Sequence, residues 1–183
     1  MAKTDIELVR DYLEMKNMAS FEELLSRYIK EIHRFVILQI GFNHPDYSFD
    51  IVQDVSIKIW KSLYMYDSKK SSFRTWIYNI ARNTCVDFFR SRKIIQNIPI
   101  EDTEEVLSEE FGQEDGISSD ELVQYIKQIV NTFDGPTKTI FFLKIEQDLT
   151  FKEIAEIVKR PMNTVKSVYL RVIDRIKKDI YKK

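Results

Sequence analysis

The sequence of 183 residues has little cysteine, glycine, proline or histidine. Its one cysteine, Cys85, excludes an internal disulfide, and four glycines and four prolines are few for a turn-rich sheet protein. The two histidines, His33 and His44, and the lack of a glycine-rich phosphate loop argue against a metal site or a nucleotide-binding enzyme. No apolar run approaches the length of a membrane span, and no signal-peptide core is present. We therefore expect a cytoplasmic, non-enzymatic protein without cofactor or metal and without membrane insertion.

The residues that are abundant favour helices. Hydrophobic residues make up 44% and aromatic residues 13% of the chain, which is enough for two helical cores. The acidic stretch in the middle, which contains Ser and Gly, is the one credible boundary. We predict an all-α protein of two small helical domains, residues 1–95 and 120–183, joined by an acidic linker at residues 96–119.

The formal net charge of -1 conceals charges that are strongly segregated along the chain. Residues 57–93 contain nine basic and two acidic residues, and residues 159–183 again contain nine basic and two acidic residues. Between these blocks, residues 101–121 contain ten acidic residues and no basic ones. Two separate basic blocks are typical of two contacts along one polyanion, so DNA is the expected partner.

Residues 149–171 have the pattern of a helix-turn-helix. Thr150 and Glu153 form a capping-box sequence, after which apolar residues recur at helical spacing. Pro161 suits the start of a second helix, in which Val165 and its apolar neighbours face inward. The polar positions of this second helix combine hydroxyl groups with cations that can reach guanine in the major groove: Thr164, Lys166, Ser167 and Arg171. An ordinary helical hairpin is the alternative to a DNA reader.

Three helices are predicted in the first domain. Ser20 and Glu23 would cap the first, and Asp50 would cap the second, whose apolar stripe comprises Val52, Val55, Ile59, Trp60 and Leu63. A third helix follows a basic loop at residues 67–72, and its polar positions can line DNA: Arg74, Tyr78, Arg82, Asn83 and Arg90. In the second domain, a capping-box sequence at Ser118 and a break at Gly135 announce two more helices before the helix-turn-helix.

Three segments together resemble the conserved regions of bacterial extracytoplasmic-function sigma factors. They are FDIVQDVSIKIW (49–60), SFRTWIYNIARNTCVDFFRSRK (72–93) and LTFKEIAEIVKRPMNTVKSVYLRV (149–172), which occur in the family's order over nearly the whole chain. The resemblance implies an alternative sigma factor, which binds core RNA polymerase and directs promoter recognition, DNA melting and transcription initiation without supplying catalytic residues. It also implies an anti-sigma factor as a further partner.

The same resemblance implies roles for individual residues. Docking on the clamp helices of the polymerase would use Gln53, Asp54 and Ile57. Asn83 would read or hold an unpaired base of the minus ten element, next to further DNA-binding residues: Arg82, Lys69, Lys70, Arg74 and Tyr78. The minus thirty-five element would be read by Thr164, Lys166, Ser167 and Arg171. For stacking on bases we favour Tyr66 and Tyr78, and we expect Trp76 to pack in the core instead.

Three positions depart from the common pattern of the family. Glycine is frequent where this chain has Lys159 and Asn163, and arginine is frequent where it has Val168. The missing arginine would remove one expected phosphate or base contact, and a good base contact contributes roughly 1–3 kcal/mol of discrimination. The promoter sequence therefore cannot be copied from relatives.

Two questions stay open from the sequence. The acidic residues 101–121 are either a solvated tether or a segment that threads through basic channels of the polymerase. A free-standing helix-turn-helix transcriptional regulator would explain the second domain but not the segments around Gln53 and Asn83. A helical adaptor protein would leave both basic blocks unexplained.

Overall fold

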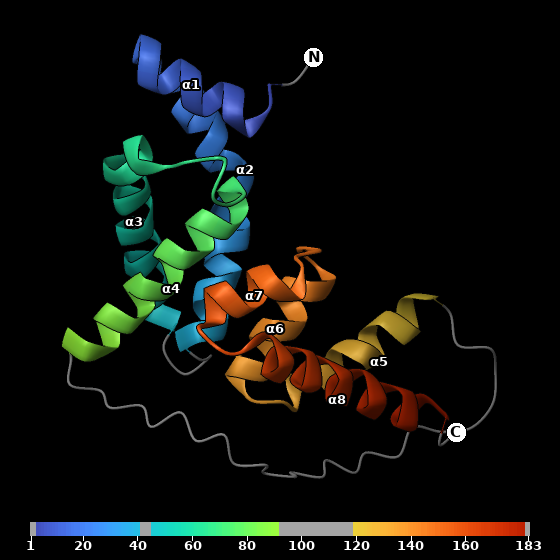
Figure 1. Ribbon diagram of the computed structural model, residues 1–183. Coiled ribbons are helices and arrows are strands. Elements are labelled where there is room, and N and C mark those ends of the chain that lie inside the picture. The colour runs from blue at the N-terminus through green and yellow to red at the C-terminus, as the bar shows by residue number, and fades with distance from the viewer. Residues whose placement is uncertain (1–2, 41–44, 92–118, 182–183) are drawn as a thin grey trace.

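The computed structural model describes residues 3–40, 45–91 and 119–181, and these residues contain eight α-helices, one 3-10 turn and no strand (Figure 1). The amino-terminal half comprises α1 (Asp5–Met15), α2 (Met18–Ile40), α3 (Pro45–Ser62), η1 (Leu63–Met65) and α4 (Phe73–Ser91). The carboxy-terminal half comprises α5 (Ser119–Asn131), α6 (Gly135–Ile145), α7 (Phe151–Val158) and α8 (Met162–Tyr181). The all-α prediction is confirmed, whereas almost all of the predicted linker lies outside the described residues.

The central element of the amino-terminal half is α2, against which α1, α3 and α4 all pack. Its apolar residues recur at helical spacing, so that one continuous stripe of side chains is buried: Phe21, Leu24, Tyr28, Ile32, Phe35, Val36 and Ile40. From α3 the residues Val55 and Ile59 complete the core, and from α4 Phe73 and Ile77 do so. The predicted long core-facing helix is therefore confirmed.

Two of the predicted helix caps are wrong. Helix α2 begins before Ser20, at a point where the Asn17 side chain accepts a backbone N–H bond, and Ser20 is buried inside the helix. Helix α3 begins at Pro45, so Asp50 lies within the helix. Proline is tolerated in a first helical turn because the N–H that it lacks would have no intrahelical acceptor there.

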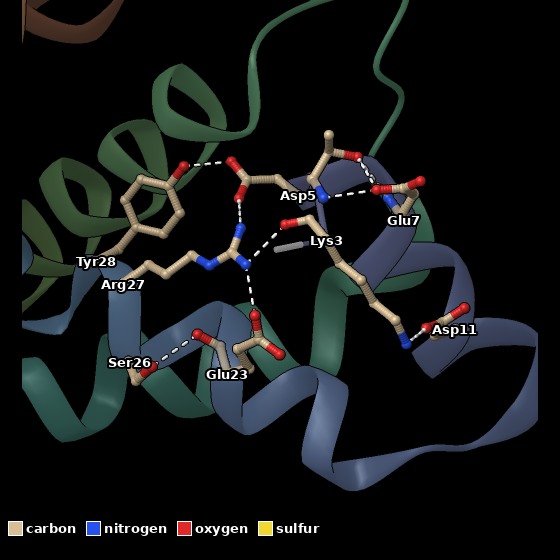
Figure 2. Close-up of polar contacts among 9 residues, drawn as sticks. Lys3, Asp5, Glu7, Asp11, Glu23, Ser26, Arg27 and Tyr28 are labelled. Atoms are coloured by element: carbon tan, nitrogen blue, oxygen red, sulfur yellow. Dashed lines mark hydrogen bonds and ion pairs between the residues drawn. The ribbon is translucent and has the colours of Figure 1, made fainter. Parts of the chain in front are cut away.

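Helix α1 was not predicted, although its start carries a capping box. The Thr4 hydroxyl accepts the Glu7 N–H, and the Glu7 carboxylate accepts the Thr4 N–H at 2.7 Å. Figure 2 shows how this end of the helix is held on α2, where Arg27 donates to the Asp5 carboxylate (3.0 Å) and to the Lys3 carbonyl oxygen (2.7 Å). These contacts, together with buried apolar residues, make α1 an integral part of the amino-terminal half.

The helix-turn-helix is confirmed as α7 and α8. The Thr150 hydroxyl accepts the Glu153 N–H, and the Glu153 carboxylate accepts the Thr150 N–H at 2.9 Å, as the capping-box sequence predicts. Helix α7 ends at Lys159 in the left-handed conformation, and α8 begins at Met162, directly after Pro161. Helices α6 and α7 pack on α8, while α5 packs on its far end. Helix α8 is thus supported along its length.

The two halves pack against each other, so that a single buried apolar cluster runs through α1–α4 and α6–α8. The contact has two zones, α2 against α6 and α4 against α7 (Figure 1). In the first zone Gln39 donates to the Thr139 hydroxyl (2.9 Å), Arg34 pairs with Glu146, and the Arg34 guanidinium also lies 5.2 Å from the centre of the Phe142 ring. We call these two zones together the half–half interface.

Candidate promoter-DNA and polymerase interfaces

Helix α8 presents all four of its predicted DNA readers on the surface. The buried positions of this helix are Val165, Val168, Val172 and Ile176, at the spacing that puts one side of a helix against a core. The exposed side holds the predicted set of Thr164, Lys166, Ser167 and Arg171. Because Val168 is only 5% exposed, the position where relatives often have arginine faces the core in this chain. The side chain at position 168 therefore belongs to the core of this chain and not to its exposed side.

The turn before α8 explains one departure from the family pattern. Lys159 has φ 55° and ψ 47°, the left-handed conformation that glycine adopts without steric cost. Its backbone N–H bonds the Ala155 carbonyl, which closes the end of α7. The chain thus keeps the backbone shape of a glycine turn with a lysine.

The loop before α4 presents two of the predicted minus ten residues to solvent. Lys69 and Lys70 are exposed, and Asp67 shapes the turn because its carboxylate accepts the Lys69 N–H at 2.9 Å. Lys70 also lies 3.8 Å from the Asp67 carboxylate. This arrangement gives a compact basic turn next to the first turn of α4.

Helix α4 distributes its predicted DNA contacts unevenly. Asn83 is exposed, with its amide available as both donor and acceptor. Arg82 is half-buried, and this burial lowers its pKa, to which the nearby charge of Arg160 contributes. Only part of the predicted minus ten set is therefore open to solvent.

Arg74 points into the half–half interface instead of outward. It donates to the Gln147 carbonyl oxygen (3.2 Å), its guanidinium lies 5.6 Å from the centre of the Tyr28 ring, and its Nε is 3.9 Å from the Glu31 carboxylate. Burial raises the pKa of Glu31, although Arg74 opposes that shift. In this arrangement Arg74 joins the two halves.

The expectation that Tyr78 is accessible for stacking on a base is wrong for this arrangement. Its side chain is fully buried, with its ring centre 5.0 Å from that of Phe35 and 6.4 Å from that of Phe142. Burial also raises the pKa of its hydroxyl group. Tyr78 is a core residue of the half–half interface.

The other aromatic residues near the basic loop form a cluster. Tyr66 is half-buried, with ring centres 5.2 Å from Phe73 and 5.5 Å from Trp76, and its hydroxyl donates to the Ser71 carbonyl (3.3 Å). Trp76 packs against the apolar cluster as expected. Tyr66 therefore buttresses the basic loop, and part of its ring stays accessible.

Helix α3 exposes the residues predicted to dock on the polymerase. Gln53 and Asp54 are exposed and Ile57 is 40% exposed, whereas Val55 and Ile59 on the opposite side are buried. An isoleucine that is exposed between two polar residues adds apolar area to a surface that carries charge. The face as a whole is chemically suited to another protein.

Three large apolar side chains extend this face, and two of them, Phe49 and Tyr64, were not predicted. Phe49, one helical turn before Gln53 on α3, is 71% exposed, and Tyr64, in the 3-10 turn that follows α3, is 72% exposed. Trp60, which we predicted to lie in the core stripe, is 45% exposed and donates from Nε1 to the Tyr12 hydroxyl (2.5 Å). Helical periodicity could have identified Phe49, which lies four residues before Gln53, but it assigns Trp60 to the apolar stripe and does not extend to Tyr64 in η1.

The remaining reactive group is Cys85. Its thiol is buried, and burial raises its pKa to about 12.

Within the described residues no group of three or more His, Cys, Asp or Glu side chains could hold a metal ion. None of the described helices combines the length and hydropathy required to span a membrane.

Comparison with known proteins gives consistent results. The family model for Sigma-70 region 2 matches residues 21–94. RNA polymerase sigma factor SigV of Bacillus subtilis is 30% identical over 164 residues, which cover 87% of this chain and 92% of that protein. An ECF RNA polymerase sigma-E factor of Haemophilus influenzae is 27% identical, with 97% of this chain and 95% of that protein covered. The sigma factor RpoE of Bartonella quintana, solved in complex with the anti-sigma factor NepR, has the same fold, with a TM-score of 0.60, 21% identity, and coverage of 86% and 94% of the two chains.

A helix-turn-helix, a region 2 helical unit and relatives that match over most of their length define a transcription initiation factor. The chain belongs to the extracytoplasmic-function sigma factors of bacterial RNA polymerase. It acts as an alternative sigma factor in transcription initiation, and sigma factors are regulatory, non-enzymatic proteins.

Proposed function

We propose that this sigma factor docks on core RNA polymerase through the exposed face of α3. The observation that carries this assignment is the division of one helix into a buried apolar side and an exposed side with Gln53, Asp54 and Ile57. The carboxylate of Asp54 supplies charge, and Ile57 supplies apolar contact. Substitutions within this face should therefore be sufficient to abolish docking.

The promoter is read by two surfaces. The minus ten element is held by Asn83, supported by Arg82 and the exposed cations Lys69 and Lys70. Arg74 can join this surface only after the two halves separate, because it bonds the Gln147 carbonyl in the half–half interface. The minus thirty-five element is read in the major groove by the exposed side of α8, which consists of Thr164, Lys166, Ser167 and Arg171. Hydroxyl groups and lysines serve the phosphates, and the guanidinium of Arg171 donates to guanine acceptors.

The organisation into parts follows from these roles. Residues 1–95 form the unit that docks on the polymerase and opens the minus ten element, and residues 120–183 form the unit that reads the minus thirty-five element. The acidic residues between them connect the two units. Because RpoE of Bartonella quintana was solved with an anti-sigma factor, an anti-sigma factor is also the expected inhibitor of this chain, and the cytoplasm is the expected compartment.

Transcription in vitro tests the proposal. Purified bacterial core polymerase is incubated with fragments of the source genome, with and without this protein, and new transcript starts are mapped. Starts that share two upstream elements are expected. If the protein bound core polymerase but produced no new starts, the assay would be repeated with core polymerase from the source bacterium. If it bound duplex DNA but had no affinity for core polymerase, a free-standing transcriptional regulator would replace the proposal.

Two variants separate the surfaces. Asp54→Lys should weaken binding to core without loss of fold, whereas Glu22→Lys, a charge reversal at an exposed position of α2, should not. Arg171→Ala should reduce discrimination at the upstream element by about tenfold, whereas Lys177→Ala, an exposed position further along α8, should leave it unchanged. If Arg171→Ala instead lowered the affinity equally for all DNA sequences, Arg171 would be reassigned to a phosphate contact.

A further inference from the structure

One side of α4 carries a row of hydrogen-bond donors that nothing above assigns. Ser72 immediately precedes the helix, and Thr75 and Asn79 follow at helical spacing, so that the three side chains share one side. The next positions on the same side are Arg82 and Asn83, which belong to the proposed minus ten surface. The donors therefore extend that surface toward the basic loop at residues 67–72.

In the structure, two carboxylates of α7 occupy these donors. One oxygen of Glu153, Oε1, accepts hydrogen bonds from the Thr75 hydroxyl (3.0 Å) and the Ser72 hydroxyl (3.3 Å). One oxygen of Glu156 accepts a hydrogen bond from the Asn79 side-chain amide at 3.2 Å. Glu153 lies at the start of α4 and Glu156 lies one turn further along it. This acidic edge of the carboxy-terminal half therefore covers the part of the minus ten surface that is nearest to the basic loop.

The set of groups on α4 has the chemistry of a phosphate contact. Hydroxyl and amide donors next to lysines and arginines are the groups that hold nucleic-acid backbones, and a carboxylate is the protein anion that most resembles a phosphate oxygen. Glu153 remains ionised there: burial alone would raise its pKa, but hydrogen bonds from Thr150, Thr75 and Ser72 together lower it. The donors thus hold a negative charge.

The contact between α4 and α7 is unfavourable at its edges. Beyond the carboxylates, Arg82 and Arg160 repel each other. Among the described residues, Arg74 Nε, Asn79 Oδ1 and Gln147 Oε1 are buried without a hydrogen-bond partner, which costs free energy in a packed interface. Separation of the halves would relieve the repulsion and return these atoms to water, whereas the two carboxylates hold the polar edge of α4 against α7.

We propose that Ser72, Thr75 and Asn79 are backbone-phosphate contacts for the single-stranded minus ten DNA, and that Glu153 and Glu156 occupy them in place of phosphates until the halves separate. This inference rests on the proposed sigma function and adds residues to its minus ten surface. It also assigns to α7 a role besides its place in the helix-turn-helix. The chain on its own then binds single-stranded DNA weakly, because its own carboxylates compete.

The test uses the full chain without polymerase and a fluorescein-labelled single-stranded DNA of random sequence as the probe, with binding followed by fluorescence anisotropy. The variant Glu153→Gln/Glu156→Gln should bind about tenfold more tightly than the wild type, which corresponds to about 1.4 kcal/mol. Glutamine at position 153 preserves the capping box, so α7 should still fold. Adding Ser72→Ala and Asn79→Ala to this variant should abolish the gain.

The control is Glu14→Gln/Glu22→Gln, which removes the same charge from exposed positions outside the half–half interface. The proposal is overturned if the test variant binds no more tightly than this control, or if its gain survives the Ser72 and Asn79 substitutions. Should circular dichroism show that the double variant is misfolded, Glu156→Gln alone, which leaves the cap intact, gives the same comparison. Transcription with core polymerase is an independent measurement: normal initiation by the wild type with no gain in the variant would refute the competition and leave the sigma function standing.

Discussion

Replacement of Lys159 by glycine should stabilise the protein. A residue with a side chain costs roughly 1–2 kcal/mol in the left-handed region, and Lys159 has φ 55° and ψ 47°. Glycine avoids this cost but loses more backbone entropy on folding, which offsets about 0.5–1 kcal/mol. The lysine side chain is exposed, so its removal sacrifices little packing. We expect a net gain of about 0.5–1 kcal/mol.

Urea denaturation followed by circular dichroism measures this difference. With a slope of about 2 kcal/mol per molar urea, the midpoint should rise by roughly 0.3–0.5 M. The matched control is Lys152→Gly, at an exposed position inside α7, where glycine should lower stability by about 1 kcal/mol. Both variants lose one lysine, so charge cannot account for opposite signs. A lower midpoint for Lys159→Gly would refute the view that this turn is strained by its side chain.

Three further predictions concern the interior. Gly135→Ala should destabilise the half–half interface by about 1 kcal/mol in urea denaturation, because the added Cβ would lie 3.0 Å from the Leu38 carbonyl oxygen; an unchanged midpoint would show that α6 shifts freely. The Cys85 thiol, with its pKa raised to about 12, should react with a thiol reagent at pH 8 only as fast as the protein unfolds. Reaction at the rate of a small-molecule thiol would contradict this burial. The wild type should be more stable than Glu153→Gln above pH 4.5, the ordinary pKa of a glutamate. Because the pKa of Glu153 is depressed, this difference in stability should shrink as the pH falls below that value. A difference that does not depend on pH would contradict an ionised Glu153 at the interface.

The elements that local sequence determines were predicted well. The helix-turn-helix follows from a capping box at Thr150, an apolar period and Pro161, all of which act within a few residues, and the structure has each of them. The same kind of pattern misled at Ser20, where a serine and a glutamate at capping-box spacing lie inside a helix that begins earlier. At Thr4 the signal was present, and the helix that it starts was overlooked. A capping-box sequence identifies a helix start only when the residues before it are not helical themselves.

Contacts between distant segments explain the other misses. The burial of Tyr78 depends on Phe142, a residue of the other half, and periodicity within α4 cannot indicate that a second protein surface covers the helix. Trp60 fits the apolar stripe of α3, yet it lies at the edge of the packed face, where its indole N–H bonds Tyr12 of the overlooked α1. The predicted readers on α8 fared better because that helix is packed on one side and its other side is exposed.

The surfaces of the proposed sigma function differ in how accessible they are within one arrangement of the chain. The docking face of α3 and the reading side of α8 are exposed, whereas the minus ten side of α4 is partly covered by α7. Docking on the polymerase and contact with the upstream element therefore need no separation of the halves, but engagement of Ser72, Thr75 and Asn79 with DNA does. The free energy for that separation has to come from partners that favour the open arrangement, because a ligand shifts an equilibrium only by its difference in affinity for the two states. Core polymerase would be such a partner if it held the two units at promoter spacing, and minus ten binding would then be restricted to the holoenzyme.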